Sequence, residues 1–378
     1  MKRIVLILTL LVSYASAKTM DFPDTIIPSA PSLKAKAHLL MNVNNGDIIS
    51  EANSHDRIPP ASLTKMMTLY LIEDMINKDQ IKLTDEVNID HVAYQAEGSS
   101  MFLELNSRIT VDELINGVII VSGNDAALAL ANYAAGSVDA FVELMNQQAQ
   151  QWGLTETHFT NPTGIPNQEH YSSAYDLAIM AKHIIEDHPH FYDRYQQTEM
   201  THNNITQKNR NRLLHKLEFV DGLKTGHTQE AGYCLVSSGK QRNMRLIAVT
   251  LGSPTDKSRD IDNEKLITYG FKFFDNLTLF DEEVATIPVW KGLQNKVALK
   301  TRHPVNITIP YGSTEAISIS VQHASSIDAP YKAGTISGKA SVFFKHHELG
   351  TYDLVTNQHL QEAGFFGKIR SQIAKLFS

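Results

Sequence analysis

The pattern of apolar residues changes near Asn276, and this change constrains the fold more than any other feature of the 378-residue chain. Before it, helical spacing is mixed with a few strand-like runs. Beyond it, short alternating runs are separated by Gly, Pro and Asn, which is typical of an all-β structure. A chain this long also favours two domains, at roughly 150 residues each. We therefore expect a mixed domain followed by a smaller β-rich domain.

The first part of the chain predicts a sheet packed against helices. The pair Asn45 and Gly46 lies between the segments 37–43 and 47–51 and predicts a hairpin, because Asn-Gly tolerates the positive φ values of a type I′ turn. Further strands are expected over 231–238 and 244–251. Helices are expected over 62–76, 111–119 after the capping box of Thr110 and Glu113, 125–135, 140–152, 174–185 and 261–274. The fold class is α/β (α+β), with an antiparallel sheet flanked by helices.

The first 17 residues are typical of an export signal. Lys2 and Arg3 precede an apolar run over 4–12, and small residues follow at 15–17, where a signal peptidase reads the chain. The run is well short of the ~20 apolar residues that span a bilayer. We predict a signal peptide over 1–17 and an exported protein. The single cysteine, Cys234, excludes an intrachain disulfide and favours a bacterial periplasm over a disulfide-rich extracellular scaffold.

The other end of the chain, 362–378, predicts a short amphipathic helix. Its apolar residues form one helical stripe at 365, 366, 369, 373, 376 and 377, and Lys368, Arg370 and Lys375 lie off or beside it. A helix of this length could lie in a lipid headgroup layer but could not cross the bilayer. Two interpretations stay open at this point: an anchor on the membrane surface, and a helix docked on the protein's own core.

Charge and composition exclude several classes of function. Lys and Arg number 34 against 41 Asp and Glu, a net charge of -7, which is the wrong sign for binding nucleic acid. The 16 histidines show no His-Glu-x-x-His spacing, so neither a metallopeptidase nor a metal site is predicted. His346 and His347 are expected on a loop or strand surface. No cofactor is expected.

Three short motifs carry candidate chemistry, at Ser62 to Lys65, Ser122 to Asn124 and Lys224 to Gly226. Prolines precede Ser62 at the start of a predicted helix, so Lys65, three residues on, emerges from the same face. A second Ser-x-x-Lys string, 237–240, begins near the end of a predicted strand, where this spacing does not align the two side chains. Ser62 is therefore the candidate nucleophile.

The three motifs are chemically complementary. A serine hydroxyl needs an adjacent base at neutral pH, and Lys65 can be that base only if burial and a neighbouring cation lower its pKa. Lys224 could be that cation and could attract a substrate carboxylate. The helix N-terminus at Ser62 offers backbone N–H groups to an oxyanion. Gly226 would let a substrate backbone approach the edge of its strand.

The triplet of motifs resembles that of the penicillin-binding proteins and serine β-lactamases. Longer strings resemble the low-molecular-mass D-alanyl-D-alanine carboxypeptidases of peptidase family S11, the group of penicillin-binding proteins 5 and 6. These strings are 60–68, 122–126, 171–174 and 221–228. The resemblance covers nearly the whole chain. It implies a transpeptidase-like catalytic domain over 18–279, a β-rich domain over 280–361 and a membrane-anchoring helix over 362–378.

The resemblance also implies roles for individual residues. Ser62 would be the acylated nucleophile, Lys65 its base and Ser122 a proton relay to the leaving amine. Asn124 would bind a substrate amide, and Lys224 and Thr225, beside Gly226, would hold the carboxylate region of the substrate. Arg259 would bind the terminal carboxylate, and Arg210 would be a further residue of the cleft. The backbone N–H groups of Ser62 and His227 would form the oxyanion hole. Thr163 stands where some relatives carry a histidine, so no imidazole role transfers.

The implied activity is removal of the terminal D-alanine from peptidoglycan stem pentapeptides, with β-lactams as acylating inhibitors. The implied location is periplasmic, attached to the outer face of the inner membrane through the C-terminal helix; a homodimer stays open. A D,D-endopeptidase acting on cross-linked muropeptides would use the same residues. A non-catalytic cell-wall interaction protein is disfavoured because every catalytic side chain is present, and a class A β-lactamase because no Glu-x-x-Leu-Asn string occurs.

Overall fold

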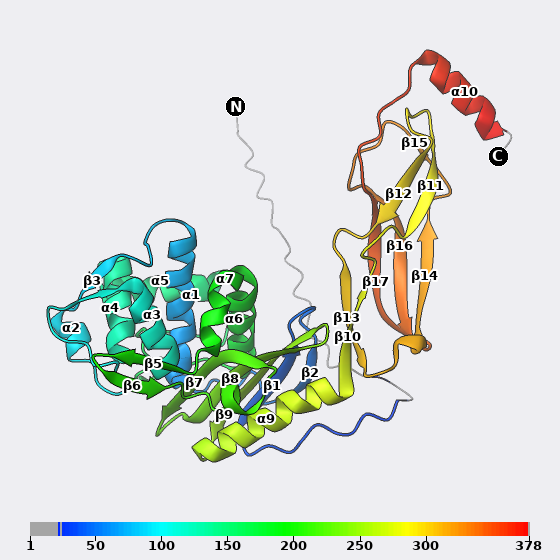
Figure 1. Cartoon of the computed structure of the whole chain (residues 1–378). Helices are drawn as coiled ribbons and strands as arrows, with labels where there is room; N and C mark the ends of the chain where they lie inside the picture. The colour runs from blue at the N-terminus through cyan, green and yellow to red at the C-terminus, as the bar shows by residue number, and fades with distance from the viewer. Residues whose placement is uncertain (1–21, 23–24, 377–378) are drawn as a thin grey trace, which may run out of the picture.

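The computed structural model describes Phe22 and residues 25–376 (Figure 1). The predicted signal peptide, 1–17, lies outside the described residues. The described chain forms a mixed domain of sheet and helices, a β-rich domain and a short C-terminal helix, so the predicted fold class is confirmed.

The central sheet of the first domain is built from both ends of that domain's sequence. Its order is β2-β1-β9-β8-β7, and each neighbouring pair is antiparallel. β7 is therefore an edge strand. The bounds are β1 (Ala37–Asn42), β2 (Ile48–Ala52), β7 (Val220–Thr228), β8 (Gly232–Gln241) and β9 (Met244–Ser253).

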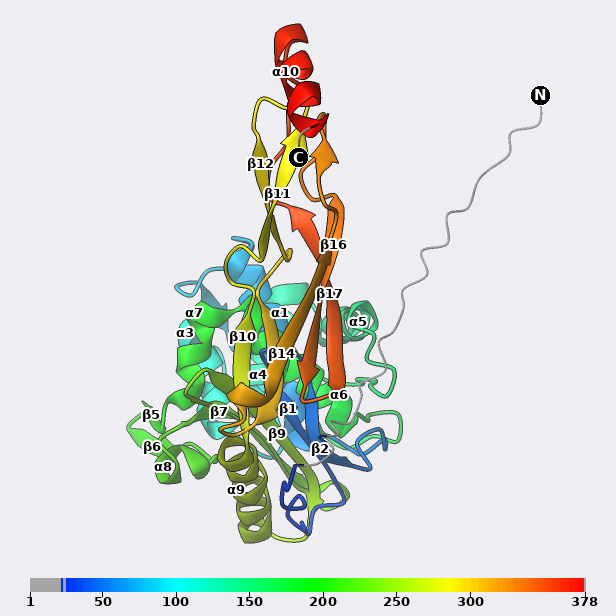
Figure 2. The ribbon, with the colours of Figure 1, turned by 90° about the vertical axis from the view of Figure 1, so that its right-hand side faces the viewer.

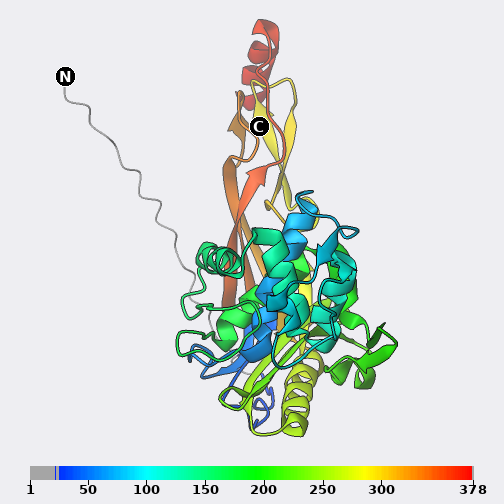
Figure 3. The ribbon, with the colours of Figure 1, turned by 90° about the vertical axis from the view of Figure 1, so that its left-hand side faces the viewer.

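Helices cover both faces of this sheet (Figure 1). The main core lies between the sheet and the helical layer that contains α1, α4 and α6, whereas α9 packs through Leu266 and Ile267 in a second core on the opposite face. Figure 3 shows the side of the molecule that carries the helical layer. The larger helices are α1 (Lys65–Asn77), α3 (Val111–Asn116), α4 (Asn124–Ala135), α5 (Val138–Gln151), α6 (Ala174–Asp187) and α9 (Asp256–Phe273). The smaller elements are α2 (His91–Tyr94), α7 (Pro189–Tyr192), α8 (Leu213–Lys216), β3 (Glu86–Asn88), β4 (Arg108–Thr110), β5 (Glu199–His202) and β6 (Ile205–Lys208).

The predicted hairpin forms, but its turn is not type I′. Gly46 has a φ of 80°, whereas Asn45 does not adopt a positive φ, which a type I′ turn requires. The loop is longer and is closed by the Asn42 amide, which donates to the Asp47 carbonyl at 2.9 Å. Asn45 is held instead by side-chain contacts to Asp47 and to Thr308 of the second domain.

Two helix boundaries also differ from the prediction. The helix expected over 261–274 begins at Asp256, because Thr255 caps it by accepting from the Ser258 amide at 3.0 Å. It ends at Phe273, and the next residue begins a strand. The predicted capping box at Thr110 is confirmed, but α3 ends at Asn116 and a wider turn continues over Gly117–Val121.

The second domain is entirely β apart from one short 3₁₀ turn and the final helix. β10 (Phe274–Leu279) pairs with β13 (Val305–Pro310), and a second sheet has the order β14-β16-β17-β12-β11-β15. The other strands are β11 (Ala285–Trp290), β12 (Lys296–Lys300), β14 (Ile317–His323), β15 (Ile327–Asp328), β16 (Ile336–Phe344) and β17 (His347–Thr356).

The β domain rises from the first domain and carries helix α10 (Phe365–Leu376) at its far end (Figure 2). The helix is tied to this end by polar contacts, in which the Lys291 amide donates to Ser371 Oγ at 2.7 Å and Lys375 Nζ lies 3.1 Å from Asp328. Phe365 and Phe366 are 74% and 85% exposed and Ile369 and Ile373 are 42% and 53% exposed, so these four residues of the stripe are not buried in the protein's own core. Within the described residues, no helix is both long and apolar enough to cross a membrane.

Candidate active site

The candidate nucleophile, Ser62, lies on a tight turn before α1. Residues Ala61–Thr64 form a single 3₁₀ turn, and the α-helix itself begins only at Lys65. Ala61 has a φ of 50°, a strained conformation for a residue with a side chain. The prediction that Ser62 and Lys65 lie on one face is confirmed, since Lys65 Nζ lies 3.0 Å from Ser62 Oγ.

The Lys65 amine is completely buried and makes three polar contacts. Besides Ser62 Oγ, it lies 2.6 Å from Asn124 Oδ1 and 2.6 Å from the Thr163 carbonyl oxygen. Burial lowers the pKa of this amine well below its ordinary value, and the nearby cations Lys224 and Arg210 lower it further. The structure therefore meets the condition under which a lysine can act as a base at neutral pH.

Ser122 and Lys224 form the second half of the site. The turn over Gly117–Val121 ends at Ser122, which adopts a left-handed conformation with a φ of 62°. The Lys224 amine, on strand β7, donates to Ser122 Oγ at 2.9 Å. Burial lowers the pKa of Lys224 to about 7, and Arg210 and Arg259 act in the same direction.

Asn124 and the residue after it fix the loop on one side of the cleft. The Asn124 amide nitrogen donates to the Glu97 carbonyl at 2.5 Å. Asp125 is buried and accepts from the Ser100 hydroxyl and from the Met101 and Leu103 amides. This carboxylate therefore organises the 97–103 loop, a role that the sequence motif did not indicate.

Seven of the ten predicted residues line one cleft of about 540 Å³, and the other three, Lys65, Asn124 and Lys224, are buried. Ser62 and Ser122 lie in its lining together with Thr225, Gly226, His227, Arg210 and Arg259. The His227 ring stacks on Tyr233 with 3.9 Å between ring centroids. Residues from three distant stretches of the chain are thus brought together as the sequence predicted.

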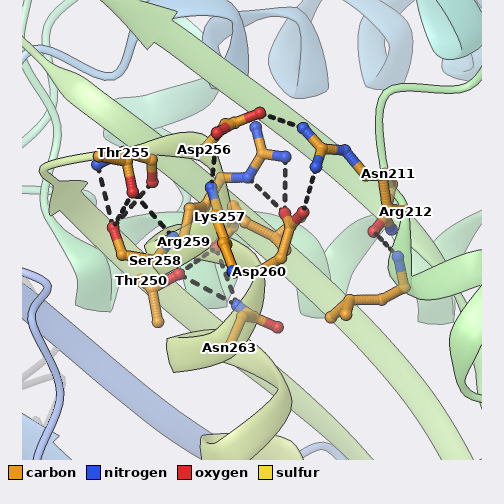
Figure 4. A network of polar contacts seen from close by, with 12 residues as sticks. Asn211, Arg212, Thr250, Thr255, Asp256, Lys257, Ser258, Arg259, Asp260 and Asn263 are labelled. Atoms are coloured by element: carbon orange, nitrogen blue, oxygen red, sulfur yellow. Dashed lines mark hydrogen bonds and ion pairs between the residues drawn. The ribbon is translucent and has the colours of Figure 1, made fainter.

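Arg259 is 5% exposed and lies on the first turns of α9, and Arg210 is exposed on the facing loop. Arg259 donates from Nε and Nη2 to Asp260 Oδ1 at 2.8 and 2.6 Å. Figure 4 shows Asp260 between the guanidinium groups of Arg259 and Arg212. Although Arg210 reaches solvent, partial desolvation by its neighbours lowers the pKa of its guanidinium group, and the neighbouring Arg259 guanidinium lowers it further.

The structure gives a further reason for the glycine at 226, while its approach to a substrate backbone stays a prediction. A side chain there would lie 2.9 Å from the Pro60 carbonyl and 3.3 Å from Ala61, so glycine allows β7 to pack against the turn that carries Ser62. Gly164 is more constrained, because it has a φ of 85° and a Cβ there would lie 1.8 Å from the Ala61 carbonyl oxygen. Both glycines therefore support the position of the nucleophile.

Two further buried groups were missed by sequence reasoning. The Thr163 carbonyl contacts Lys65, and any residue supplies such an oxygen, so no side-chain pattern could reveal it. Glu73, two turns along α1, is completely buried and its Oε1 accepts from the Tyr195 hydroxyl at 3.3 Å. Among the described residues, Glu73 Oε2 has no hydrogen-bond partner, and burial raises the pKa of the Glu73 carboxyl group to about 8. The sequence did contain one indication of this group, because Glu73 is a charged residue among apolar positions of the helix predicted over 62–76.

Other sequence features lie outside the site. Cys234 is buried on β8, where burial raises the pKa of its thiol to about 11. Ser237 lies on β8 and its hydroxyl bonds to Asn263, so the second Ser-x-x-Lys string forms no site. Over Phe22 and residues 25–376, no cluster of three or more His, Cys, Asp or Glu side chains could hold a metal ion.

The chain is similar to known proteins over nearly its full length. Residues 24–255 match the peptidase S11 family, described as D-alanyl-D-alanine carboxypeptidase, and residues 274–362 match the penicillin-binding protein 5 C-terminal domain. The chain is 39% identical to the D-alanyl-D-alanine carboxypeptidase DacA of Escherichia coli K12, with 100% of this chain and 96% of that protein covered.

Solved structures show the same similarity. Penicillin binding protein 5 from Haemophilus influenzae has a TM-score of 0.83 at 38% identity, with 89% of this chain and 100% of that chain covered. Ampicillin-bound penicillin-binding protein D2 from Listeria monocytogenes has a TM-score of 0.60 at 28% identity, with 65% of this chain and 100% of that chain covered.

Proposed function

Because the chain belongs to the D-alanyl-D-alanine carboxypeptidases of peptidase family S11, we propose that it removes the terminal D-alanine from peptidoglycan stem pentapeptides through an acyl-enzyme on Ser62. The family membership confirms the resemblance seen in the sequence. The observation that carries the proposed mechanism is the distance of 3.0 Å between Ser62 Oγ and a buried lysine amine whose pKa is lowered.

The contacts of Lys65 suit a neutral amine that accepts a proton. A neutral amine has two N–H groups and one lone pair. Asn124 Oδ1 and the Thr163 carbonyl, each at 2.6 Å, can accept from the two N–H groups. The lone pair is then left for the Ser62 hydroxyl, which donates to it and becomes the nucleophile.

In the acylation step, Ser62 Oγ attacks the carbonyl carbon of the penultimate D-alanine while its proton passes to Lys65 Nζ. The backbone N–H groups of Ser62 and His227 would stabilise the oxyanion. Ser122 would donate its proton to the leaving amine as the peptide bond breaks, and the proton that Lys65 took from Ser62 would replace it, so that Lys65 becomes neutral again; the Lys224 amine, 2.9 Å from Ser122 Oγ, would hold that hydroxyl in place. Water then attacks the acyl-enzyme with Lys65 again as base, which releases the shortened peptide.

The substrate is expected to enter along the exposed edge of β7. Arg210 and Arg259 line this cleft and act on the buried Lys224 amine, so these three cations would attract the C-terminal carboxylate of the peptide. Asn124 and Thr225 would contact the peptide chain. β-Lactams carry an acylating carbonyl beside a carboxylate, so we propose that they acylate Ser62 in the same cleft; a bound β-lactam is named for penicillin-binding protein D2.

We also propose a periplasmic location, with the protein attached to the outer face of the inner membrane. The signal-like sequence over 1–17 supports export. The exposed apolar side chains of α10, including Ile369 and Ile373, support attachment to a lipid surface, and Lys368 and Lys375 add positive charge to the same helix.

The test compares wild type with Ser62→Ala. We expect wild type to release D-alanine from a pentapeptide and to be labelled covalently by fluorescent penicillin, and the variant to do neither. Ser237→Ala, at the other Ser-x-x-Lys string, is the matched control and should be labelled like wild type. Labelling of Ser62→Ala would show that another residue is the nucleophile. Release from cross-linked muropeptides alone would favour the D,D-endopeptidase.

A further inference from the structure

The loop over residues 209–213 alternates buried asparagines with exposed arginines. Asn209 and Asn211 are buried, and the Asn211 side chain donates to the Gly222 carbonyl of β7 at 3.1 Å. The Asn211 amide in turn donates to Asn209 Oδ1 at 2.9 Å. The asparagines therefore attach the loop to the site strand, and Arg210 and Arg212 lie exposed between and after them.

Arg212 joins this loop to helix α9 through two carboxylates. Its Nη2 donates to Asp256 Oδ2, and its Nη1 lies 3.5 Å from Asp260 Oδ2. The other oxygen of Asp260, Oδ1, accepts both bonds from Arg259. Asp260 is therefore shared, with one oxygen facing each guanidinium group (Figure 4).

This arrangement offsets a concentration of positive charge beside the cleft. Desolvation is the larger cause of the lowered pKa of both Arg210 and Lys224. In addition, Arg259 lowers the pKa of Arg210, and both arginines lower the pKa of Lys224, so the three cations lie close together. Repulsion between the two arginines would push the loop away from α9. The contacts of Arg212 with Asp256 and Asp260 oppose that separation.

We propose that Arg212 is a positioning residue for substrate recognition, which fixes the loop of Arg210 against the helix of Arg259 so that both guanidinium groups can face one carboxylate. This inference rests on the proposed function, in which the C-terminal carboxylate of the peptide binds here. Among the described residues, Arg259 Nη1 has no hydrogen-bond acceptor, so one edge of that guanidinium group remains for the substrate.

The chain offers a matched control for a merely structural tie. Lys216, on α8, bonds to Glu264 of α9 at 2.5 Å and so joins the same two segments further along the helix. Unlike Arg212, which lines the cleft, Lys216 neither contacts Asp260 nor lines the cleft. Both lysine and arginine here are more than half exposed, and exposed ion pairs contribute little to global stability, so both alanine variants should fold.

The experiment measures D-alanine release by wild type, Arg212→Ala, Arg212→Lys and Lys216→Ala. Each protein is given a peptide ending in D-Ala-D-Ala and the same peptide as a C-terminal amide. For Arg212→Ala we expect KM for the free acid to rise roughly five- to tenfold with kcat within about twofold, because ground-state binding of the carboxylate is weakened. KM for the amide should not change, and Arg212→Lys should recover part of the loss.

The controls separate the possible results. An equal KM rise in Lys216→Ala, or in Arg212→Ala with the amide peptide, would assign Arg212 a structural role and overturn the inference. The inference would also be overturned if KM of Arg212→Ala for the free-acid peptide were the same as that of wild type. In that case D-alanine release by the wild type would still support the proposed function. A wild type that releases no D-alanine from either peptide would overturn the proposed function and this inference with it.

Discussion

Glu73 makes the stability of the first domain depend on pH in a way that can be calculated. Its carboxyl group is completely buried and its pKa is raised to about 8 from an ordinary value of 4.5. The folded state therefore binds the proton more tightly than the unfolded state, in which the group ionises at its ordinary pKa. This contribution to stability is fully present below about pH 4.5 and is lost as the pH rises towards about pH 8.

The magnitude follows from the two pKa values. Each pH unit within this window removes up to ~1.36 kcal/mol from the free energy of unfolding. Between about pH 5 and about pH 8 the loss is about 3 to 4 kcal/mol, a large part of the stability of a typical domain. Glu73→Gln removes the ionisable group and keeps an oxygen for the Tyr195 hydroxyl, so this component of the pH dependence should disappear.

Urea unfolding followed by the fluorescence of Trp152, which packs against the core of the first domain, measures the effect. The difference in unfolding free energy between wild type and Glu73→Gln should change by about 3 to 4 kcal/mol over this pH range, in favour of the variant at high pH. Glu143→Gln, on the exposed face of α5, is the matched control and should follow wild type. Parallel pH profiles for wild type and Glu73→Gln would refute the reasoning.

Two other predictions concern binding. Burial and the neighbouring arginines lower the pKa of Lys224 to about 7, so the charge of this amine is lost as the pH rises through that value. KM for a free-acid peptide should therefore increase between about pH 7 and about pH 9, while KM for the amide peptide stays constant. A KM that does not change with pH for either peptide would contradict a titrating Lys224 in the carboxylate site. Deletion of residues 363–378 should abolish sedimentation with vesicles of anionic lipid and leave D-alanine release unchanged. The double variant Phe365→Ser with Phe366→Ser should weaken sedimentation, because these two side chains are the most exposed of the described apolar groups of α10. Vesicle binding that survives the deletion would show that α10 is not the attachment.

The sequence predicted most of what depends on periodicity and on short motifs. The spacing of Ser62 and Lys65 was sufficient to place both on one face, because three residues make nearly one helical turn. The start of α9 was missed because its first turns are polar, and its cap comes from Thr255 and Ser258, which no apolar stripe marks. The type I′ turn was wrong because contacts from the second domain, made by Thr308, hold Asn45 in another conformation.

Within the site, the groups that could not be predicted are those whose role depends on tertiary packing. The Asp125 carboxylate organises a loop more than twenty residues away in sequence. Glu73 meets its hydrogen-bond partner, Tyr195, only in the folded chain, because the two are far apart in sequence. The contact between Arg212 and two carboxylates of α9 likewise joins segments that are distant in sequence.

The carbonyl contact at residue 163 has a consequence for how freely that position can vary. Lys65 is held there by an oxygen of the main chain, which every amino acid carries. The Thr163 hydroxyl bonds within its own loop, to Asn161, so it takes no part in holding the amine. Exchange of threonine for another residue that fits the loop can therefore leave the general base in place, whereas a substitution that moves the backbone, such as one at Gly164, would displace it.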